Sequence, residues 1–362
     1  MADIKNDRLI FRHLDELYKN SFQIDLKKNS KWVVFSDLHV GNGTMKDDFR
    51  DNASLFLYVL KHYYLAEEFN LVLNGDIEEL QRFREDRIVG AWPELYWLFD
   101  ELHQAGKFYK IVGNHDLGLL LSKGEGSRYP LHHSLVLKWN DHPIFIYHGH
   151  QASHKYLKYN RLLGITLKYI ANPLRIKNFS VAHSSSKQYN IEKKVYQYSS
   201  SRKIVSIIGH THRPLFESLS KVERLKHKVE QLTREYSGLD DPEKLNMIKK
   251  SIKNYRKELL KMYKKDKDLF NRKNIYDAAI MVPCLFNSGC VVGKRGITSL
   301  EIEQDRIRLV HWFDRNTSRK YLKNYGYEPE KFRDSDYYRM IINEENLAYI
   351  FARIDLLSSS EN

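Results

Sequence analysis

Carboxylate, imidazole and amide side chains occur together in five short fragments of the sequence, and each fragment follows a run of apolar residues. The fragments are Asp37-Leu38-His39, Gly75-Asp76, Gly113-Asn114-His115-Asp116, His148-Gly149-His150 and Gly209-His210-Thr211-His212-Arg213-Pro214. None of them contains cysteine. Oxygen and imidazole ligands without thiolate suit a hard to borderline divalent ion such as Mn, Fe or Zn. The fragments therefore predict a metal site.

Each fragment stands at the end of a segment with the composition of a buried strand. The predicted strands that precede the fragments are 31–35, 71–73, 108–112, 143–147 and 204–208. Helical patterns at 47–69 and 93–105 separate the first three, and further strands follow at 284–292, 297–302 and 307–312. Alternating strands and helices predict an α/β fold, in which ligands bind outside the carboxyl ends of the strands.

The fragments also contain the ligands that a site with two metal ions would need. Two cations held about 3.5 to 4 Å apart can clamp the attacking and the leaving oxygen of a phosphoryl transfer. Such a pair needs one bridging carboxylate and neutral ligands on either side. Asp76 is the candidate bridge, because the preceding Gly75 lets the backbone approach the site closely.

These fragments resemble the calcineurin-like metallophosphoesterase superfamily over about residues 31–214 and at Asn287-Ser288-Gly289. The resemblance implies an α/β, four-layer β-sandwich flanked by helices, and a hydrolase with two divalent ions, Mn first and Fe or Zn as alternatives. It also implies a hydroxide between the metals as the nucleophile, since a bound cation lowers the pKa of water toward about 7. The implied ligands are Asp37, His39 and His212 for one metal, Asn114, His148 and His210 for the other, and Asp76 as the bridge.

The same resemblance gives a catalytic role to His115, as the general acid or charge stabiliser for the leaving oxygen. Glu79 stands where members of the superfamily often carry the acidic partner of that histidine, although a purely structural role is equally open. His150 occupies a variable position of the superfamily and is expected to lie just outside the metal ligands.

The substrate is less well defined than the chemistry. The Ser36-Asp37-Leu38-His39 opening, the block from Gly75 to Glu79 and the segment 209–214 look like the branch of UDP-2,3-diacylglucosamine pyrophosphatases, which cleave a lipid-linked diphosphate. Many members of that branch carry Arg where this chain has His115. We therefore predict hydrolysis of a phosphomonoester, phosphodiester or diphosphate bond. The lipid diphosphate hydrolase, a nuclease of the same superfamily and a non-catalytic scaffold remain as alternatives.

Four parts of the chain are predicted from the motifs and patterns. They are an N-terminal extension at 1–30, a catalytic domain at 31–216 and 276–315, an inserted antiparallel helical hairpin at 217–275, and a C-terminal tail at 316–362 with a helix at 343–357. The hairpin is predicted because apolar residues recur three and four apart in both of its halves. It would serve structure, formation of a homo-oligomer, or docking of a protein partner.

A basic and apolar stretch at 155–177 lies between the fourth and fifth fragments. Its cations Arg161, Lys168 and Arg175 recur seven residues apart, so they would share one face of a helix. The stretch is either a pair of surface helices or a lid over the site. In the second case Arg161 and Lys168 would contact the substrate.

Composition limits the class of protein. The chain has 362 residues, only two cysteines and a formal net charge of +13. This charge favours an anionic partner or substrate, which we expect to be a phosphorylated small molecule or a lipid-linked one; nucleic acid is open but not favoured. The sequence has no signal-peptide pattern and no apolar run of the roughly 18 residues that a membrane span needs. A cytoplasmic location is therefore predicted, with at most peripheral contact with a membrane.

Overall fold

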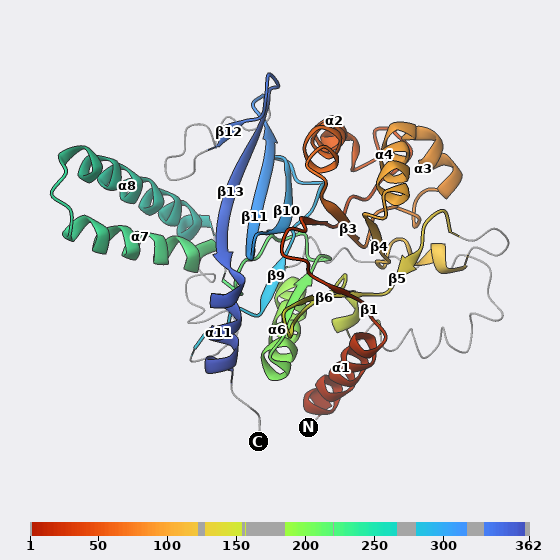
Figure 1. Ribbon diagram of the computed structural model, residues 1–362, viewed down its shortest axis with the longest axis horizontal. Coiled ribbons are helices and arrows are strands. Elements are labelled where there is room, and N and C mark those ends of the chain that lie inside the picture. Colours follow the sequence, from red (N-terminus) through yellow and green to blue (C-terminus); the bar gives the residue numbers. More distant parts are fainter. Residues whose placement is uncertain are drawn as a thin grey trace.

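The computed structural model describes residues 2–121, 127–153, 156, 185–219, 221–265, 280–316 and 329–358. Over these residues the chain forms two mixed β-sheets with helices packed around them (Figure 1). The α/β class predicted from the sequence is confirmed. None of the described helices combines the length and the apolar character that crossing a lipid bilayer requires.

The larger sheet has eight strands and carries the first three ligand fragments. Its order is β12 (Glu330–Lys331), β13 (Tyr337–Asn346), β11 (Arg306–Asp314), β10 (Ile297–Glu303), β2 (Trp32–Phe35), β3 (Asn70–Asn74), β4 (Phe108–Ile111) and β5 (Leu131–His132). The strands from β2 to β5 are parallel to one another, whereas β10 pairs with β2 in the antiparallel sense. The carboxyl ends of β2, β3 and β4 therefore meet at one edge.

The smaller sheet has five strands and carries the other two fragments. Its order is β1 (Phe22–Asp25), β6 (Leu135–Trp139), β7 (His142–Ile146), β8 (Val205–Ile208) and β9 (Leu285–Asn287). β7, β8 and β9 are parallel, so the residues that follow β7 and β8 also leave at a common edge.

Two apolar cores explain why the strand sequences are almost continuously hydrophobic. Because neighbouring residues of a strand point to opposite faces, Trp32 and Val34 join one core while Val33 and Phe35 join the other. The first core contains residues of both sheets and of α1 (Ala2–Lys19), α6 (Ser185–Arg202) and α11 (Leu347–Leu357). The second core packs the outer face of the larger sheet against α2 (Ala53–Val59), α3 (Glu85–Ala91) and α4 (Pro93–Gln104).

Two long helices, α7 (Lys221–Ser237) and α8 (Pro242–Lys265), lie side by side and extend away from the sheets (Figure 1). We call this pair the arm. Apolar residues of the predicted seam are buried at its base and between the helices, including Val222, Leu225, Ile248 and Tyr255. Asp241 caps α8, because its Oδ1 accepts a hydrogen bond from the backbone N–H of Glu243 at 3.0 Å.

Several predicted elements have different bounds in the structure. The predicted helix at 47–69 is broken into a 3-10 turn (Arg50–Asn52), α2 and a π-helical segment (Leu60–Leu65). The predicted strand at 284–292 shortens to β9, because the residues after Asn287 form the loop that reaches the site. The predicted helix at 343–357 begins only at Leu347, since residues up to Asn346 extend β13 along β11.

Glu217, at the base of the arm, gives a prediction about stability. Burial raises the pKa of its carboxyl group to about 7 from an ordinary 4.5, against the attraction of Arg353. The folded chain therefore binds more protons than the unfolded chain between about pH 4.5 and pH 7, and stability falls as the pH rises through that window. In Glu217→Gln, we expect the decrease in unfolding free energy from pH 5 to pH 8 to be smaller by about 2 kcal/mol, measured by urea denaturation. If the unfolding free energy of Glu217→Gln changed with pH as much as that of the native chain, the prediction would be wrong.

Candidate metal centre

The two sheets bring the predicted ligand residues to one place from five strand ends. Asp37 and His39 follow β2, Asp76 follows β3, and Asn114 and His115 follow β4 in the larger sheet. The smaller sheet contributes the rest, which are His148 after β7 and His210 and His212 after β8. The site therefore lies where the carboxyl ends of both sheets meet, and neither sheet holds a complete set of ligands.

The backbone at these residues is strained in a consistent way. Asp37, His39, Asp76, His210 and His212 all have positive φ angles, between 47° and 63°. This left-handed region is uncommon for residues other than glycine, and such strain gathers at functional sites because the surrounding structure must hold it in place. All five of these residues belong to clusters of possible metal ligands.

Glycines beside the ligands allow the loops to come very close together. A Cβ atom on Gly75 would lie 2.5 Å from Nδ1 of His148, and one on Gly113 would lie 2.2 Å from Oδ1 of Asp76. Gly75 also has a φ angle of +80°. The close approach that the sequence predicted at Gly75 is therefore present, and Gly113 has the same function one strand away.

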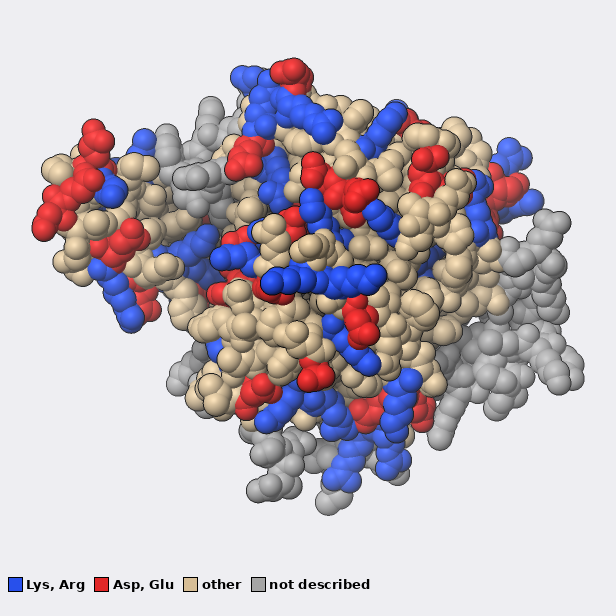
Figure 2. Space-filling model, viewed as in Figure 1, with Lys and Arg blue, Asp and Glu red and all other residues tan. Residues whose placement is uncertain are grey.

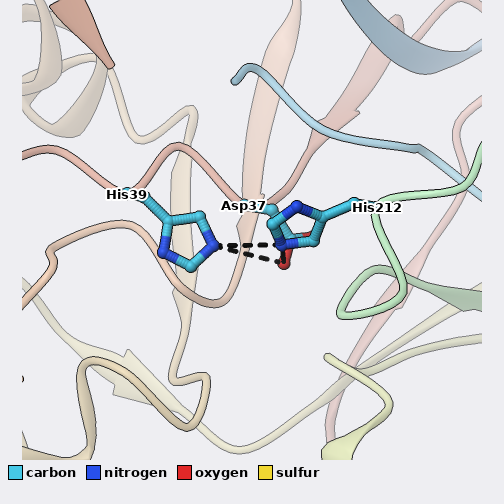
Figure 3. Close-up of side chains that lie close together, drawn as sticks. All are labelled: Asp37, His39 and His212. Carbon is cyan, nitrogen blue, oxygen red and sulfur yellow. Dashed lines mark hydrogen bonds and ion pairs between the residues drawn. The ribbon is translucent and has the colours of Figure 1, made fainter. Parts of the chain in front are cut away.

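The first cluster consists of Asp37, His39 and His212 (Figure 3). Nε2 of His212 lies 3.0 Å from Oδ1 of Asp37, and Nε2 of His39 lies 3.9 Å from the same oxygen. The two Nε2 atoms are only 3.1 Å apart. Figure 3 shows both rings directed at the Asp37 carboxylate. Three ligand atoms that converge in this way match the coordination of a shared cation.

The second cluster consists of Asp76, His148 and His210. Nε2 of His148 lies 3.1 Å from Oδ2 of Asp76, and the rings of His148 and His210 have centroids 5.1 Å apart. Nδ1 of His148 is 2.7 Å from the carbonyl oxygen of Asn74. A proton on Nδ1 would be donated to that oxygen, which leaves Nε2 free to bind a metal, as in most metal-binding histidines.

Asp76 lies between the two clusters. Its Oδ2 is 4.0 Å from Nε2 of His39, in the first cluster, as well as 3.1 Å from Nε2 of His148 in the second. Its Oδ1 accepts a hydrogen bond from the backbone N–H of His115 at 2.8 Å, which fixes the orientation of the carboxylate. This position is the one expected of a bridging ligand.

Three buried ligand atoms are placed to bind a cation. Oδ1 of Asp37, Oδ1 of Asn114 and Nε2 of His148 form no hydrogen bond with the part of the chain that the structure describes. Buried polar atoms normally have hydrogen-bond partners, and ligation of a metal ion is one of the standard reasons for an exception. All three are atoms that oxygen- and nitrogen-binding divalent ions accept as ligands. The donor set therefore fits the divalent metals implied by the sequence.

Interactions among the buried ligands set their protonation states. Burial would raise the pKa of Asp37, but His212 and His148 lower it to about 2. Burial likewise opposes ionisation of Asp76, and His148 and His115 nevertheless keep its pKa well below the ordinary value. Burial and the neighbouring His148 lower the pKa of His210 to about 3, so this imidazole is neutral. Two carboxylates and a neutral imidazole are forms that bind metal. Burial opposes protonation of His148 and His212 as well, but Asp76 raises the pKa of His148 to about 9 and Asp37 raises that of His212 well above its ordinary value, so these two rings would release a proton on binding metal.

Glu79 connects the metal ligand His39 with His115. Its carboxylate lies 2.9 Å from Nδ1 of His115 and 3.1 Å from Nδ1 of His39. Burial opposes ionisation of Glu79, but hydrogen bonds with the two histidines lower its pKa to about 2. With Nδ1 of His115 held in this way, Nε2 faces Asp76 at 3.9 Å. The acidic partner predicted for His115 is thus in contact with it.

His150 is buried behind the second cluster. Its ring lies 5.3 Å from that of His148 and 6.2 Å from that of His210, centroid to centroid. Burial and the two neighbouring histidines lower the pKa of His150 well below its ordinary value. A neutral ring packed on the ligands agrees with the expected position just outside them.

Sequence reasoning missed several residues that support the site. Asp116 accepts hydrogen bonds from the backbone N–H groups of Gly113 and Ile77, which joins the loops after β4 and β3. Glu192 of α6 is buried and accepts a hydrogen bond from Thr211 at 3.0 Å. Burial opposes protonation of His212, but Asp37 and, to a smaller extent, Cys290 raise the pKa of that histidine. Of these, only Asp116 stands inside a ligand fragment; Glu192 and Cys290 carry no local signal.

A shallow pocket of about 450 Å³ is lined by Leu80, Phe83, Gly118 and the helix start at 84–86, and none of the proposed metal ligands lines it. The predicted substrate contacts Arg161 and Lys168, together with most of the 155–177 stretch, lie outside the described residues.

Comparisons with known proteins add little to this geometry. No protein-family model matches the chain, and no curated protein matches it. A solved structure from Streptococcus pneumoniae, described as a conserved uncharacterized protein and predicted phosphoesterase, is similar over 78% of this chain and 89% of its own. Its sequence is 12% identical to this chain, and the TM-score of the two structures is 0.29.

Proposed function

We propose that this protein is a phosphoesterase that depends on two divalent metal ions, built on a four-layer β-sandwich of the metallophosphoesterase type. The observation that carries the proposal is the pair of clusters at the carboxyl ends of both sheets, with Asp76 between them. The reaction class is hydrolysis of a phosphomonoester, phosphodiester or diphosphate bond.

Each predicted ligand has a place in this proposal. Asp37, His39 and His212 would hold one ion and Asn114, His148 and His210 the other, with Asp76 shared between them. Mn is the expected metal, with Fe or Zn as alternatives. When bound, the pair of ions would lower the pKa of water and neutralise charge on the attacking and leaving oxygens.

The protein's own residues would complete the reaction at the leaving oxygen. The Glu79 carboxylate accepts a hydrogen bond from Nδ1–H of His115 and so fixes the orientation of the ring. A proton on Nε2 is then directed toward the Asp76 side of the site. That proton is available for the departing oxygen, as general acid catalysis requires. Asp76 and Glu79 attract the protonated form of His115 and, although burial opposes them, raise its pKa.

Two other functions compete with this proposal. A lipid diphosphate hydrolase would use the same metals. A scaffold without catalytic activity would not need to keep the ligands. All seven are present, and six of the seven, without Asn114, stand in the two clusters.

The test is hydrolysis by protein that has been stripped of metal. We expect no cleavage of bis-p-nitrophenyl phosphate or p-nitrophenyl phosphate after treatment with a chelator, because no described side chain replaces the Lewis acid. Addition of Mn, Fe or Zn should restore cleavage, and Mg should restore less because it binds imidazole poorly. Cleavage that continues at the full rate without metal would contradict the proposal.

A further inference from the structure

The arm carries a large part of the protein's positive charge. Residues 221–265 contain fourteen lysines and arginines and seven acidic residues, a net charge of +7 within a chain whose total is +13. From Lys244 to Lys265, α8 has nine basic residues and only Glu258 against them. On the face of the body shown in Figure 2, by contrast, acidic and basic residues are intermixed. The charge of α8 is therefore unusual for this molecule.

Five of these lysines form one straight row along α8. The row consists of Lys250, Lys253, Lys257, Lys261 and Lys264, and all five side chains are exposed. Successive members are three or four residues apart, so at 3.6 residues per turn they lie within about 80° of the helix surface. From Lys250 to Lys264 the row is about 21 Å long, at a rise of 1.5 Å per residue.

The row lies opposite the contact between α8 and α7. Ile248 and Tyr255, which are buried, face α7, about half a turn around the helix from the lysines. Two salt bridges on the arm are Arg234–Glu230 and Lys244–Asp241. Among the described residues, none forms a salt bridge with Lys253, Lys257, Lys261 or Lys264. These four exposed lysines therefore carry charge that no described acidic residue pairs with.

We propose that this lysine row binds the phosphate backbone of a nucleic acid. Five cations of one sign in a line match a polymer that carries a negative charge at regular short intervals. Contacts of this kind are made to phosphates and do not depend on base sequence. The inference does not depend on the proposed hydrolase activity, because the row contains none of the residues of the metal centre.

An anionic membrane fits the row less well. A helix that lies on a membrane buries an apolar stripe among the lipid headgroups and holds its cations at the sides. In α8 the apolar stripe is already packed against α7, and the exposed apolar residues are divided, with Met247 on one flank of the lysine row and Leu260 and Tyr263 on the other. The exposed surface of α8 therefore has charge but no apolar stripe.

The experiment is binding of a fluorescein-labelled 20-nucleotide DNA to the full chain, followed by fluorescence anisotropy from 50 to 300 mM salt in the presence of EDTA. Five phosphate contacts predict a slope of log K against log salt of about −3.5 for the single strand and −4.5 for a duplex. Replacing Lys253, Lys257 and Lys261 by glutamine should make the slope shallower by about 2 to 3 and weaken binding at least tenfold at 100 mM salt.

A matched control removes the same charge elsewhere. Lys27, Lys28 and Lys331 are exposed lysines outside the arm, and replacing all three by glutamine should leave the slope within about 1 of the native value.

Equal losses of affinity in the two triple variants would overturn the proposal, as would no binding of DNA by the native chain. Tighter binding to phosphatidylglycerol vesicles or to polyglutamate than to DNA would also overturn it. Native cleavage of bis-p-nitrophenyl phosphate and a native melting temperature in the arm variant would show that the metal centre and the fold are intact.

Discussion

Replacing Asp76 by asparagine is expected to lower the rate of phosphoester hydrolysis by about 10³-fold or more, which corresponds to at least about 4 kcal/mol of lost transition-state stabilisation. The substitution removes the negative charge that both clusters share, and an amide does not bridge two cations as a carboxylate does. The backbone N–H of His115 can still donate to Oδ1 of the asparagine, so the loop should keep its conformation. The measurement is kcat/KM for bis-p-nitrophenyl phosphate with saturating Mn.

A neutralised carboxylate outside the site provides the control. Glu230 on the arm forms an exposed ion pair with Arg234, and Glu230→Gln should leave the rate within about twofold, since exposed pairs contribute little to stability. Melting temperatures would show that both variants are folded. Full activity of Asp76→Asn with Mn would mean that the two clusters do not act as one centre.

Replacing His115 by alanine is expected to lower the rate by about 10²-fold for a phosphodiester with an alkyl leaving group, as loss of a general acid does. The loss should be much smaller with p-nitrophenolate, which departs without a proton. Metal content should stay near the native value, because His115 is not among the proposed ligands. The measurement is kcat for the two leaving groups, together with metal analysis of the purified variant.

Glu79→Gln provides a comparison with His115→Ala, because the amide keeps the size of the side chain but removes the charge between His115 and His39. We expect a loss of about tenfold, in the range of residues that orient metal ligands and catalytic groups. Equal losses for both leaving groups in His115→Ala, or loss of metal from that variant, would show that His115 has a different role.

The local part of the site could be predicted from the sequence. Residues such as Val33, Val34 and Phe35 can form a buried strand in almost any context, and a turn-forming Gly or Asp after the strand places the next side chains at its tip. The positions of Asp37, Asp76 and His210 at strand ends therefore follow from short-range patterns.

Features that depend on distant pairing could not be predicted in this way. The division of the ligands between two sheets depends on β2, β3 and β4 pairing in one sheet and on β7 and β8 pairing in the other, which are contacts between segments far apart in the chain. The N-terminal residues have a polar pattern, yet β1 extends the smaller sheet by pairing with β6. Glu192 reaches Thr211 only because α6 packs behind β8, and nothing in its own helix indicates a role in the site.

The most direct test of the central claim is anomalous X-ray scattering at the Mn edge from crystals of the full chain grown with Mn. Two peaks per chain are expected, one contacted by Asp37, His39 and His212, the other by Asn114, His148 and His210, with Asp76 in contact with both. One peak, or peaks away from these residues, would contradict a dinuclear centre at the meeting point of the two sheets.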